Sequence, residues 1–327
     1  MPNNKIQILG QTIAKGKGAM VNLDIAKLHT RTKVQVPIVI ERGKKDGPTL
    51  LLIGGIHGNE INGIEIVRQL VAKEYNKPQQ GMVICIPVAN VFGFLNQTRQ
   101  FPDGRDLNRV FPGSPRGSLA SRFAYHIIKE VVPLADYCID YHTGGDSRFN
   151  MPQIRIDGES PESLALAKIF DAPFIIRSAR KEKSFRETLH RLKKKVLLFE
   201  GGKSMHIDHM VTQTGIAGTM RVMQHLGMRD FENELSEIRE IAVPGEVRDG
   251  PIIVHTTQWM RAKHSGMFHP YAVLGKKVKK GEVLGNISGP FGYFERKIKS
   301  SHSGYLICIN QAPIVNQGDA IFHIART

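Results

Sequence analysis

Residues 49–60 read TLLLIGGIHGNE, and this stretch decides the fold. Its first half is a continuous apolar run, which is typical of a strand buried on both faces of a sheet. The run ends at His57, and the next residues, INGIEIVRQLVAKE, carry apolar side chains at helical spacing from Ile61 to Val71. Strand, short turn and helix together form the first half of a βαβ unit.

The same alternation of strands and helices extends over residues 35–240 and predicts an α/β fold with a mostly parallel central sheet flanked by helices. Residues 35–56 read as two strands joined by a Gly-Lys-Lys-Asp-Gly turn. A polar stretch at 92–117 is rich in Gly, Pro and Arg, and a loop of this length is usually functional. Further strands are predicted at 81–90, 137–142 and 196–200, and helices at 118–132, 164–171, 185–195, 215–226 and 231–241.

The sequence pattern changes near residue 245, where helical periodicity is replaced by short predicted strands separated by Gly and Pro. Residues 278–287, VKKGEVLGNI, match residues 315–324, VNQGDAIFHI, as a weak internal repeat. This pattern predicts a small all-β domain of two similar halves. We therefore expect a catalytic domain at 1–244 and a C-terminal β domain at 245–327.

The composition excludes several classes of protein. Of the 327 residues, 41% are hydrophobic and 23% charged, which is ordinary for a globular chain. No apolar run approaches the ~20 residues of a membrane helix, and the polar N-terminus lacks a signal-peptide core. Three widely spaced cysteines in apolar stretches predict buried, reduced thiols and a cytoplasmic protein. These cysteines are Cys85, Cys138 and Cys308.

The formal net charge of +15 raises the question of an anionic partner. The lysines are scattered along the chain, however, and no nucleic-acid motif accompanies them. We therefore expect a solvated basic surface, with neither nucleic acid nor membrane as a partner. The excess charge weakly favours an anionic small substrate, and a homo-oligomer is left open.

Polar residues at the ends of the apolar strands predict a metal site. Ligands of open α/β sheets bind beyond the carboxyl ends of the strands, where His57, Glu60, His142 and Glu200 all fall. His57 and Glu60 form an H-x-x-E pair on a strand-to-helix turn, and His142 completes the three protein ligands that catalytic zinc takes. The alternative without a metal is that each histidine is an ordinary polar residue at a strand end.

Two further carboxylates accompany this set. Asp140 lies two residues before His142, on the same face of its strand, and either orients a ligand histidine or bonds nearby backbone. Glu200 is a lone carboxylate at the end of an apolar strand, a residue that is costly to bury without a role. It is a candidate general base, with a fourth metal ligand or an ion-pair partner as alternatives.

Four motifs in this order resemble the succinylglutamate desuccinylase and aspartoacylase family of the zinc-carboxypeptidase superfamily. They are GGIHGNE (54–60), GRDLNRVFPG (104–113), DYHTGG (140–145) and FEGG (199–202). The resemblance covers residues 50 to about 205 and implies a zinc-carboxypeptidase-like domain. The C-terminal region resembles a barrel-sandwich carrier module, but its hairpin, Ile287 to Gly292, lacks the lysine that such carriers modify.

The resemblance implies a role for each matching residue. One zinc ion per chain would be held by His57, Glu60 and His142, with Glu200 as general base and acid. Asn108 and Arg109 would clamp the substrate carboxylate, which an arginine fork matches in shape. Arg99 best matches the family's oxyanion-stabilising arginine, with Arg105 as a rival. A further substrate arginine among Arg177, Arg180 and Arg186, and a tyrosine among Tyr271, Tyr293 and Tyr305, stay unassigned.

These residues predict zinc-dependent deacylation of a small N-acyl amino acid by an activated water. A carboxypeptidase-type peptidase with a more open cleft is the first alternative. A non-catalytic binding protein that keeps the fold is the second. The acyl group, the amino acid and the oligomeric state are not readable from the residues. For the C-terminal β region we expect a wall around the site that restricts it to small substrates, or a subunit contact.

Overall fold

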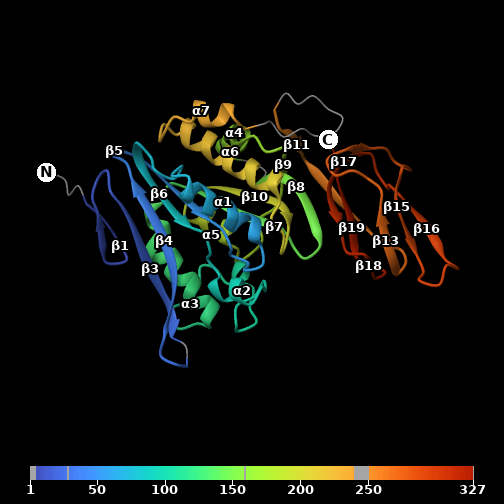
Figure 1. Cartoon of the computed structure of the whole chain (residues 1–327), viewed down its shortest axis with the longest axis horizontal. Coiled ribbons are helices and arrows are strands. Elements are labelled where there is room, and N and C mark those ends of the chain that lie inside the picture. The colour runs from blue at the N-terminus through green and yellow to red at the C-terminus, as the bar shows by residue number, and fades with distance from the viewer. Residues whose placement is uncertain (1–4, 28, 158–159, 239–249, 327) are drawn as a thin grey trace.

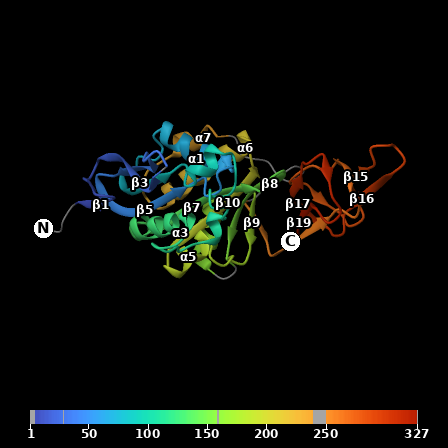
Figure 2. The ribbon, with the colours of Figure 1, turned by 90° about the horizontal axis from the view of Figure 1, so that it is seen from below.

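The computed structural model describes residues 5–27, 29–157, 160–238 and 250–326. These residues form one sheet of 13 strands with helices against it, plus a two-stranded and a four-stranded sheet (Figure 1, Figure 2). The mixed α/β class is as predicted. Within the described residues no helix is both long and apolar enough to cross a membrane. All three cysteines are free and buried, also as predicted.

The middle of the large sheet is parallel, in the order β10-β7-β5-β6. Its flanking strands are antiparallel, so the sheet as a whole is mixed. Ile53 pairs with Asp140, and His142 pairs with Glu200, so the carboxyl ends of the parallel strands meet at one edge. These strands are β5 (Lys45–Ile53), β6 (Gln80–Ile86), β7 (Tyr137–Gly144) and β10 (Lys195–Lys203), with β4 (Lys33–Arg42) antiparallel beside β6.

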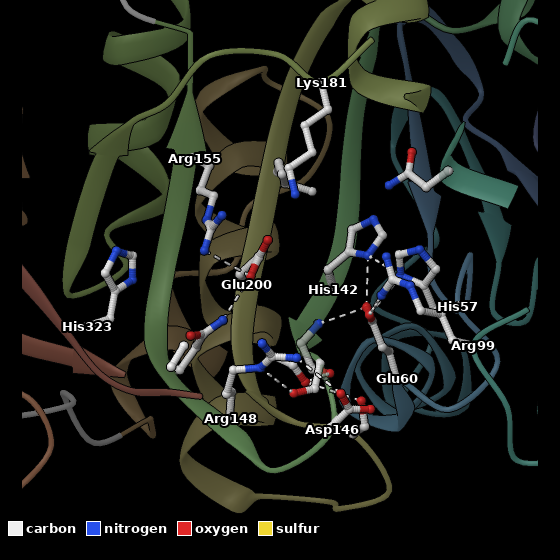
Figure 3. Close-up of a pocket in the computed structure, with 18 of the residues that line it drawn as sticks. His57, Glu60, Arg99, His142, Asp146, Arg148, Arg155, Lys181, Glu200 and His323 are labelled. Carbon is white, nitrogen blue, oxygen red and sulfur yellow. Dashed lines mark hydrogen bonds and ion pairs between the residues drawn. The ribbon is translucent and has the colours of Figure 1, made fainter. Parts of the chain in front are cut away.

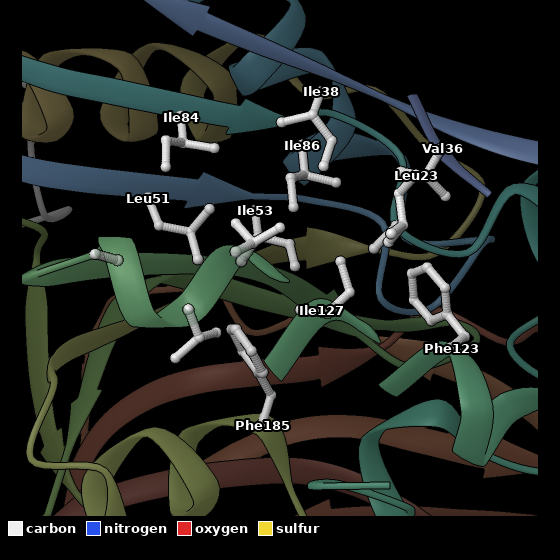
Figure 4. Packing of buried hydrophobic residues seen from close by; sticks show 14 of the residues in the cluster. Leu23, Val36, Ile38, Leu51, Ile53, Ile84, Ile86, Phe123, Ile127 and Phe185 are labelled. Atoms are coloured by element: carbon white, nitrogen blue, oxygen red, sulfur yellow. The ribbon is translucent and has the colours of Figure 1, made fainter. Parts of the chain in front are cut away.

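Strand β5 is buried on both faces, as its apolar run predicts. Leu51 and Ile53 point into a cluster with Phe123 and Phe185 on one face (Figure 4). Leu50 and Leu52 join a second cluster, which contains apolar side chains of α1 and α6, on the other face. Each such aliphatic side chain contributes roughly 1.5–3 kcal/mol on full burial, so the apolar run fixes the central position of this strand.

Every predicted helix is present, although some bounds differ. Helix α6 begins at His209, earlier than Gly215, because the Asp208 side chain caps it by accepting from the Val211 amide. The predicted helix at 118–132 is α-helical only to His126 and continues as a π turn, Ile127–Val131. The helices are α1 (Ile61–Ala72), α3 (Leu119–His126), α4 (Pro161–Phe170), α5 (Phe185–Arg191), α6 (His209–His225) and α7 (Glu232–Ser236).

Several strands were not predicted, and the most consequential is β8 (Arg148–Ile156). It pairs antiparallel with β10 on one side and β17 (Gly304–Asn310) on the other. Its sequence, RFNMPQIRI, mixes charged and polar residues with a proline, which argues against an interior strand. Pro152 is tolerated where the β8–β10 register shifts. The other unpredicted strands are β1 (Ile6–Ile8), β2 (Gln11–Ile13), β3 (Gly18–Lys27) and β9 (Phe174–Arg177).

The internal repeat near the C-terminus corresponds to a repeated structure. In each half a two-residue strand is followed by a tight turn and a longer strand: β14 (Lys277–Val278) and β15 (Val283–Ser288), then β18 (Ile314–Val315) and β19 (Ala320–Arg326). Gly281 and Gly318 take φ of 88° and 94°, a conformation that favours glycine. Each turn also has the same side-chain hydrogen bond. The Glu282 carboxylate accepts the Lys279 backbone amide, and the Asp319 carboxylate accepts the Asn316 backbone amide.

The C-terminal strands are joined to the central sheet. Strands β17, β19 and β12 continue it beyond β8, and β11 pairs with β9. The predicted boundary at residue 245 lies outside the described residues, and the division into 1–244 and 245–327 stays a prediction. The remaining strands of this region are β11 (Ile252–Val254), β12 (Thr256–Arg261), β13 (Gly266–Pro270), β16 (Glu295–Lys299) and β17 (Gly304–Asn310).

Candidate metal centre and cavity

A cavity of about 620 Å³ lies at the carboxyl edge of the parallel strands. The seven residues to which the sequence assigns a metal-binding, catalytic or substrate-binding role all line this cavity, and Figure 3 labels five of them. They come from β7, β10, the turn before α1 and the long loop after β6. The set is His57, Glu60, Arg99, Asn108, Arg109, His142 and Glu200.

His57, Glu60 and His142 converge on one point. The two Nδ1 atoms of the histidines lie 3.2 Å apart. Glu60 Oε1 lies 2.7 Å from His57 Nδ1, and Oε2 lies 2.8 Å from His142 Nδ1. All three side chains are buried, and their ligand atoms lie within 4.8 Å of one another.

Each histidine has a carboxylate behind it. His57 Nε2 lies 3.0 Å from Asp106 Oδ1, and His142 Nε2 lies 3.1 Å from Asp140 Oδ1. A carboxylate at Nε2 keeps the proton there and leaves Nδ1 free to bind a cation. Asp140 thus lies where an orienting acceptor is required, whereas Asp106 was not singled out because only the fold brings it to His57.

The electrostatics of this group favour an ionised Glu60. Burial would raise the pKa of the Glu60 carboxyl, but the charges of His57 and His142 outweigh it and hold this pKa well below its usual range. Burial would also raise the pKa of the Asp106 carboxyl, but the hydrogen bonds and charges of His57 and Arg99 lower this pKa. The amide of Thr143 also donates to Glu60 Oε2 at 3.0 Å. The site therefore holds anionic oxygens beside two imidazole nitrogens.

Close backbone packing sets the position of the HGNE turn. A Cβ added at Gly58 would lie 1.9 Å from the carbonyl carbon of Gly93, so only glycine fits against α2 (Val91–Leu95). The Asn90 side chain caps α2 by accepting the Gly93 backbone amide at 2.8 Å. Its amide nitrogen also donates to the carbonyl of Arg99 at 3.2 Å. The long loop is thereby tied to the metal-site turn.

Of the two candidate arginines, the structure places Arg99 in the cavity and leaves Arg105 exposed outside its lining. Arg99 Nη1 lies 3.1 Å from Glu60 Oε1, and its Nη2 lies 2.9 Å from Asp106 Oδ2. The guanidinium is therefore adjacent to the metal centre.

Asn108 and Arg109 lie on a 3₁₀ turn, Leu107–Arg109, and both line the cavity. Asn108 Oδ1 accepts the Phe185 amide at 2.8 Å, which ties the loop to α5. Arg109 donates to the Asn108 carbonyl, and no ion pair to it is found among the described residues. This arginine is free to receive an anionic group in the cavity.

Glu200 stands apart from the metal group. Its Oε2 accepts the Asn150 amide at 2.8 Å and lies 3.2 Å from Arg155 Nη2 (Figure 3). Both partners come from β8, the strand that the sequence did not reveal. Of the three alternatives for Glu200, an ion pair is present, and the described metal group does not include this carboxylate.

The C-terminal strands supply the far wall of the cavity. Trp259 of β12 and His323 of β19 stack with ring centroids 4.1 Å apart at 4°. Burial, followed by the charge of Arg155, lowers the pKa of His323 to about 3, so this imidazole is neutral. None of the described lining residues is a tyrosine, so the unassigned tyrosine stays unassigned. Of the three unassigned arginines, Arg186 lines the cavity.

The donor set fits a zinc ion. Two imidazole nitrogens and a carboxylate are the ligands of many catalytic zinc sites, which hold the metal at about 2.0–2.2 Å and so place neighbouring ligand atoms about 3.3 Å apart. The two histidine nitrogens lie 3.2 Å apart, close to this value, whereas the Glu60 oxygens lie at hydrogen-bond distances of 2.7 and 2.8 Å from them. The carboxylates at both Nε2 atoms complete the arrangement that metal-binding histidines show.

Known proteins resemble this chain in sequence and fold. Residues 46–226 match the succinylglutamate desuccinylase/aspartoacylase catalytic domain. The chain is 30% identical over 307 residues to the N-alpha-acetyl-L-2,4-diaminobutyric acid deacetylase of Halomonas elongata, covering 90% of this chain and 86% of that protein. A succinylglutamate desuccinylase/aspartoacylase structure from Rhodobacter sphaeroides superimposes with a TM-score of 0.80 at 25% identity, covering 95% of each chain.

The fold is also similar to the product-bound ectoine utilization protein EutE (DoeB) of Ruegeria pomeroyi. The TM-score is 0.81 at 21% identity, and 99% of this chain and 100% of that chain are covered. At this identity the likeness concerns the fold. It extends over the C-terminal strands as well as the metal-site half of the chain.

Proposed function

Because the chain belongs to the succinylglutamate desuccinylase/aspartoacylase family, we propose that it hydrolyses the amide bond of a small N-acyl amino acid with the help of zinc. The observation that carries the proposal is the buried group of His57, Glu60 and His142 at one wall of a cavity that also holds a separate carboxylate, Glu200. One zinc ion per chain would be held by the three ligands.

A zinc ion bound there would supply Lewis-acid activation of water and of the scissile carbonyl. Glu200 is proposed to accept a proton from the attacking water and to return it to the departing nitrogen. Its Oε1 has no hydrogen-bond partner among the described residues, so this oxygen is free to exchange protons. Arg99 lies beside the metal ligands and is proposed to stabilise the developing oxyanion, a term worth several kcal/mol in related sites.

Asn108 and Arg109 are proposed to hold the substrate carboxylate. An arginine without an ion-pair partner in the described structure can pair with a carboxylate through two parallel hydrogen bonds. Fixing the carboxylate would place the amide near the metal group and reduce the entropic part of the barrier. The name of the Halomonas relative supports an N-acyl amino acid as the class of substrate.

The size of the cavity favours a small substrate over a peptide. Its volume of about 620 Å³ suits a small molecule, and Trp259, Arg261 and His323 of the C-terminal strands close its far side. A carboxypeptidase-type peptidase would need an opening for a longer chain. We propose accordingly that the C-terminal strands restrict the substrate to small N-acyl amino acids.

The test is metal analysis of the purified protein and its His142→Ala variant, with a panel of N-acyl amino acids assayed for amine release. His225→Ala, which removes an exposed histidine of α6, is the matched control. We expect about one zinc per chain in the protein and the control, and loss of zinc and activity together in His142→Ala. No zinc in any of the three proteins after incubation with excess metal would refute the proposal.

A further inference from the structure

Strand β8 brings two donors to the same atom of Glu200. Asn150 Nδ2 donates to Oε2 at 2.8 Å, and Arg155 Nη2 lies 3.2 Å from that oxygen. Figure 3 shows Arg155 approaching the Glu200 carboxylate from the side away from His57 and His142. The other oxygen, Oε1, accepts no hydrogen bond from the part of the chain that the structure describes.

We propose that Arg155 and Asn150 are positioning residues that fix the Glu200 carboxylate by its Oε2 and leave Oε1 as the single oxygen that exchanges protons. This inference rests on the proposed function, in which Glu200 is the general base. It assigns a catalytic contribution to β8, whose residues are absent from the motifs that carry the family resemblance.

The physical reason is the freedom of a glutamate side chain. A glutamate that is not held loses about 1.5–2 kcal/mol of rotamer entropy when it adopts one conformation. A charge-assisted bond from a guanidinium and a second bond from an amide impose that conformation before substrate arrives. Because a displacement of about 1 Å can lower a rate 100-fold, such a restraint matters for proton transfer.

Arg155 is itself confined, which makes it suitable as a restraint. Its side chain is 22% exposed and that of Glu200 is 16% exposed, so water competes little for the pair. Arg155 lines the same cavity as the stacked rings of Trp259 and His323. The C-terminal strands thus border the same cavity as the arginine that holds the proposed base.

The register of the sheet explains how the pair forms. Strands β8 and β10 are antiparallel, with Gln153 opposite Glu200 and Arg155 opposite Leu198. The register shifts between Glu200 and Gly202, and beyond the shift Asn150 lies opposite Gly202. Diagonal neighbours on one face of a sheet lie within reach of long side chains. Arg155 and Asn150 therefore flank Glu200 from opposite directions along β8.

A direct role of Arg155 in binding substrate is the competing explanation, and a double-mutant cycle separates the two. The variants are Arg155→Met, Arg155→Lys, Asn150→Ala, Glu200→Gln and the double variant Arg155→Met/Glu200→Gln. Arg68→Met, which removes an exposed arginine paired with Glu65 on α1, is the matched control. The probes are N-alpha-acetyl-L-2,4-diaminobutyrate and N-acetyl-L-aspartate, and the cycle uses whichever is hydrolysed faster.

If Arg155 acts through Glu200, Arg155→Met should lower kcat about 10-fold or more with KM changed less than about twofold. Arg155→Lys should recover part of this loss, and Asn150→Ala should lower kcat about threefold or more. In the Glu200→Gln background, Arg155→Met should change the residual kcat by less than about twofold. Zinc content and melting temperature should stay at the values of Arg68→Met.

Two results would overturn the inference. One is a raised KM with unchanged kcat in Arg155→Met, which would show substrate binding. The other is a full, independent loss of kcat in the Glu200→Gln background. If Glu200→Gln alone keeps the activity of the unmodified protein, the general base of the proposed function is wrong, and this result is distinct from the other two. If Arg155→Met does not fold, Arg155→Lys and Asn150→Ala carry the same test.

Discussion

Replacing Asp106 by asparagine tests whether the carboxylates behind the histidines tune the metal site. Asp106 Oδ1 lies 3.0 Å from His57 Nε2, and Oδ2 lies 2.9 Å from Arg99 Nη2. Asparagine has nearly the same shape, so the substitution removes the charge and one acceptor while leaving the loop backbone in place. The backbone amide of Asn108 donates to Asp106 Oδ1 at 2.8 Å, and it can donate to the side-chain oxygen of the asparagine in the variant.

The expected magnitude follows from these two contacts. In Asp106→Asn, His57 Nε2 keeps an oxygen acceptor but loses the negative charge behind it, and Arg99 loses the acceptor Oδ2. A hydrogen bond to a charged group is worth about 1.5–3 kcal/mol, and mutation of the carboxylate partner of a metal-binding histidine typically lowers metal affinity or activity 10- to 100-fold. We therefore expect the zinc dissociation constant of Asp106→Asn to rise about 10- to 100-fold, which corresponds to about 1.4–2.7 kcal/mol. The value of kcat/KM at saturating zinc should also fall, because Arg99 loses its anchor.

The assay is competition for zinc against a chelator of known affinity, followed by kinetics at saturating zinc. Asp24→Asn is the control, because Asp24 also accepts from two side chains, Gln35 and Lys33, but does so on the exposed face of β3. The control should bind zinc like the unmodified protein. A zinc affinity of Asp106→Asn within about twofold of the control would refute the view that this carboxylate orients His57.

Three other outcomes are expected. Arg109→Met should raise KM about 30-fold with a smaller change in kcat, since it removes a carboxylate clamp worth about 2 kcal/mol; a change confined to kcat would contradict this role. His323 has a folded pKa of about 3, below its unfolded value, so its stabilising contribution is present above the unfolded pKa and is lost as pH falls toward 3. Between about pH 7.5 and about pH 5.5, urea titrations should show the protein losing about 1.4 kcal/mol more stability than His323→Gln; equal losses would contradict the buried neutral imidazole. Gly58→Ala should lower the free energy of unfolding by about 2 kcal/mol or more in urea, because the added Cβ meets the Gly93 backbone, whereas Gly289→Ala, with its nearest atom at 3.5 Å, should be nearly neutral.

The parallel core and the candidate metal ligands follow from local sequence patterns. The apolar run before His57 predicts a strand that is buried on both faces, and the periodicity after Glu60 predicts the helix behind it. A polar residue directly after such a strand must lie at the carboxyl edge of the sheet. For this reason the sequence alone was enough to identify His57, Glu60 and His142 as a cluster.

Strand β8 and the residues it carries were not predictable in this way. Its polar residues and Pro152 give no clean alternation, because the strand is interior and Arg148, Asn150 and Arg155 line the cavity. The contact of Arg155 and Asn150 with Glu200 depends on pairing between strands 50 residues apart in the chain. Similarly, Asp106 reaches His57 only because the long loop folds back onto the HGNE turn.

The C-terminal region has features that the local sequence predicted and features that only the tertiary structure decided. The V-x-x-G repeat predicted two similar halves, and in each half the repeated glycine, Gly281 or Gly318, takes a positive φ that side chains disfavour. That its strands extend the central sheet and place Trp259 and His323 against the cavity was decided by tertiary structure. Local sequence encodes periodicity, turns and the residues at strand ends, whereas contacts between distant strands depend on how the whole chain packs.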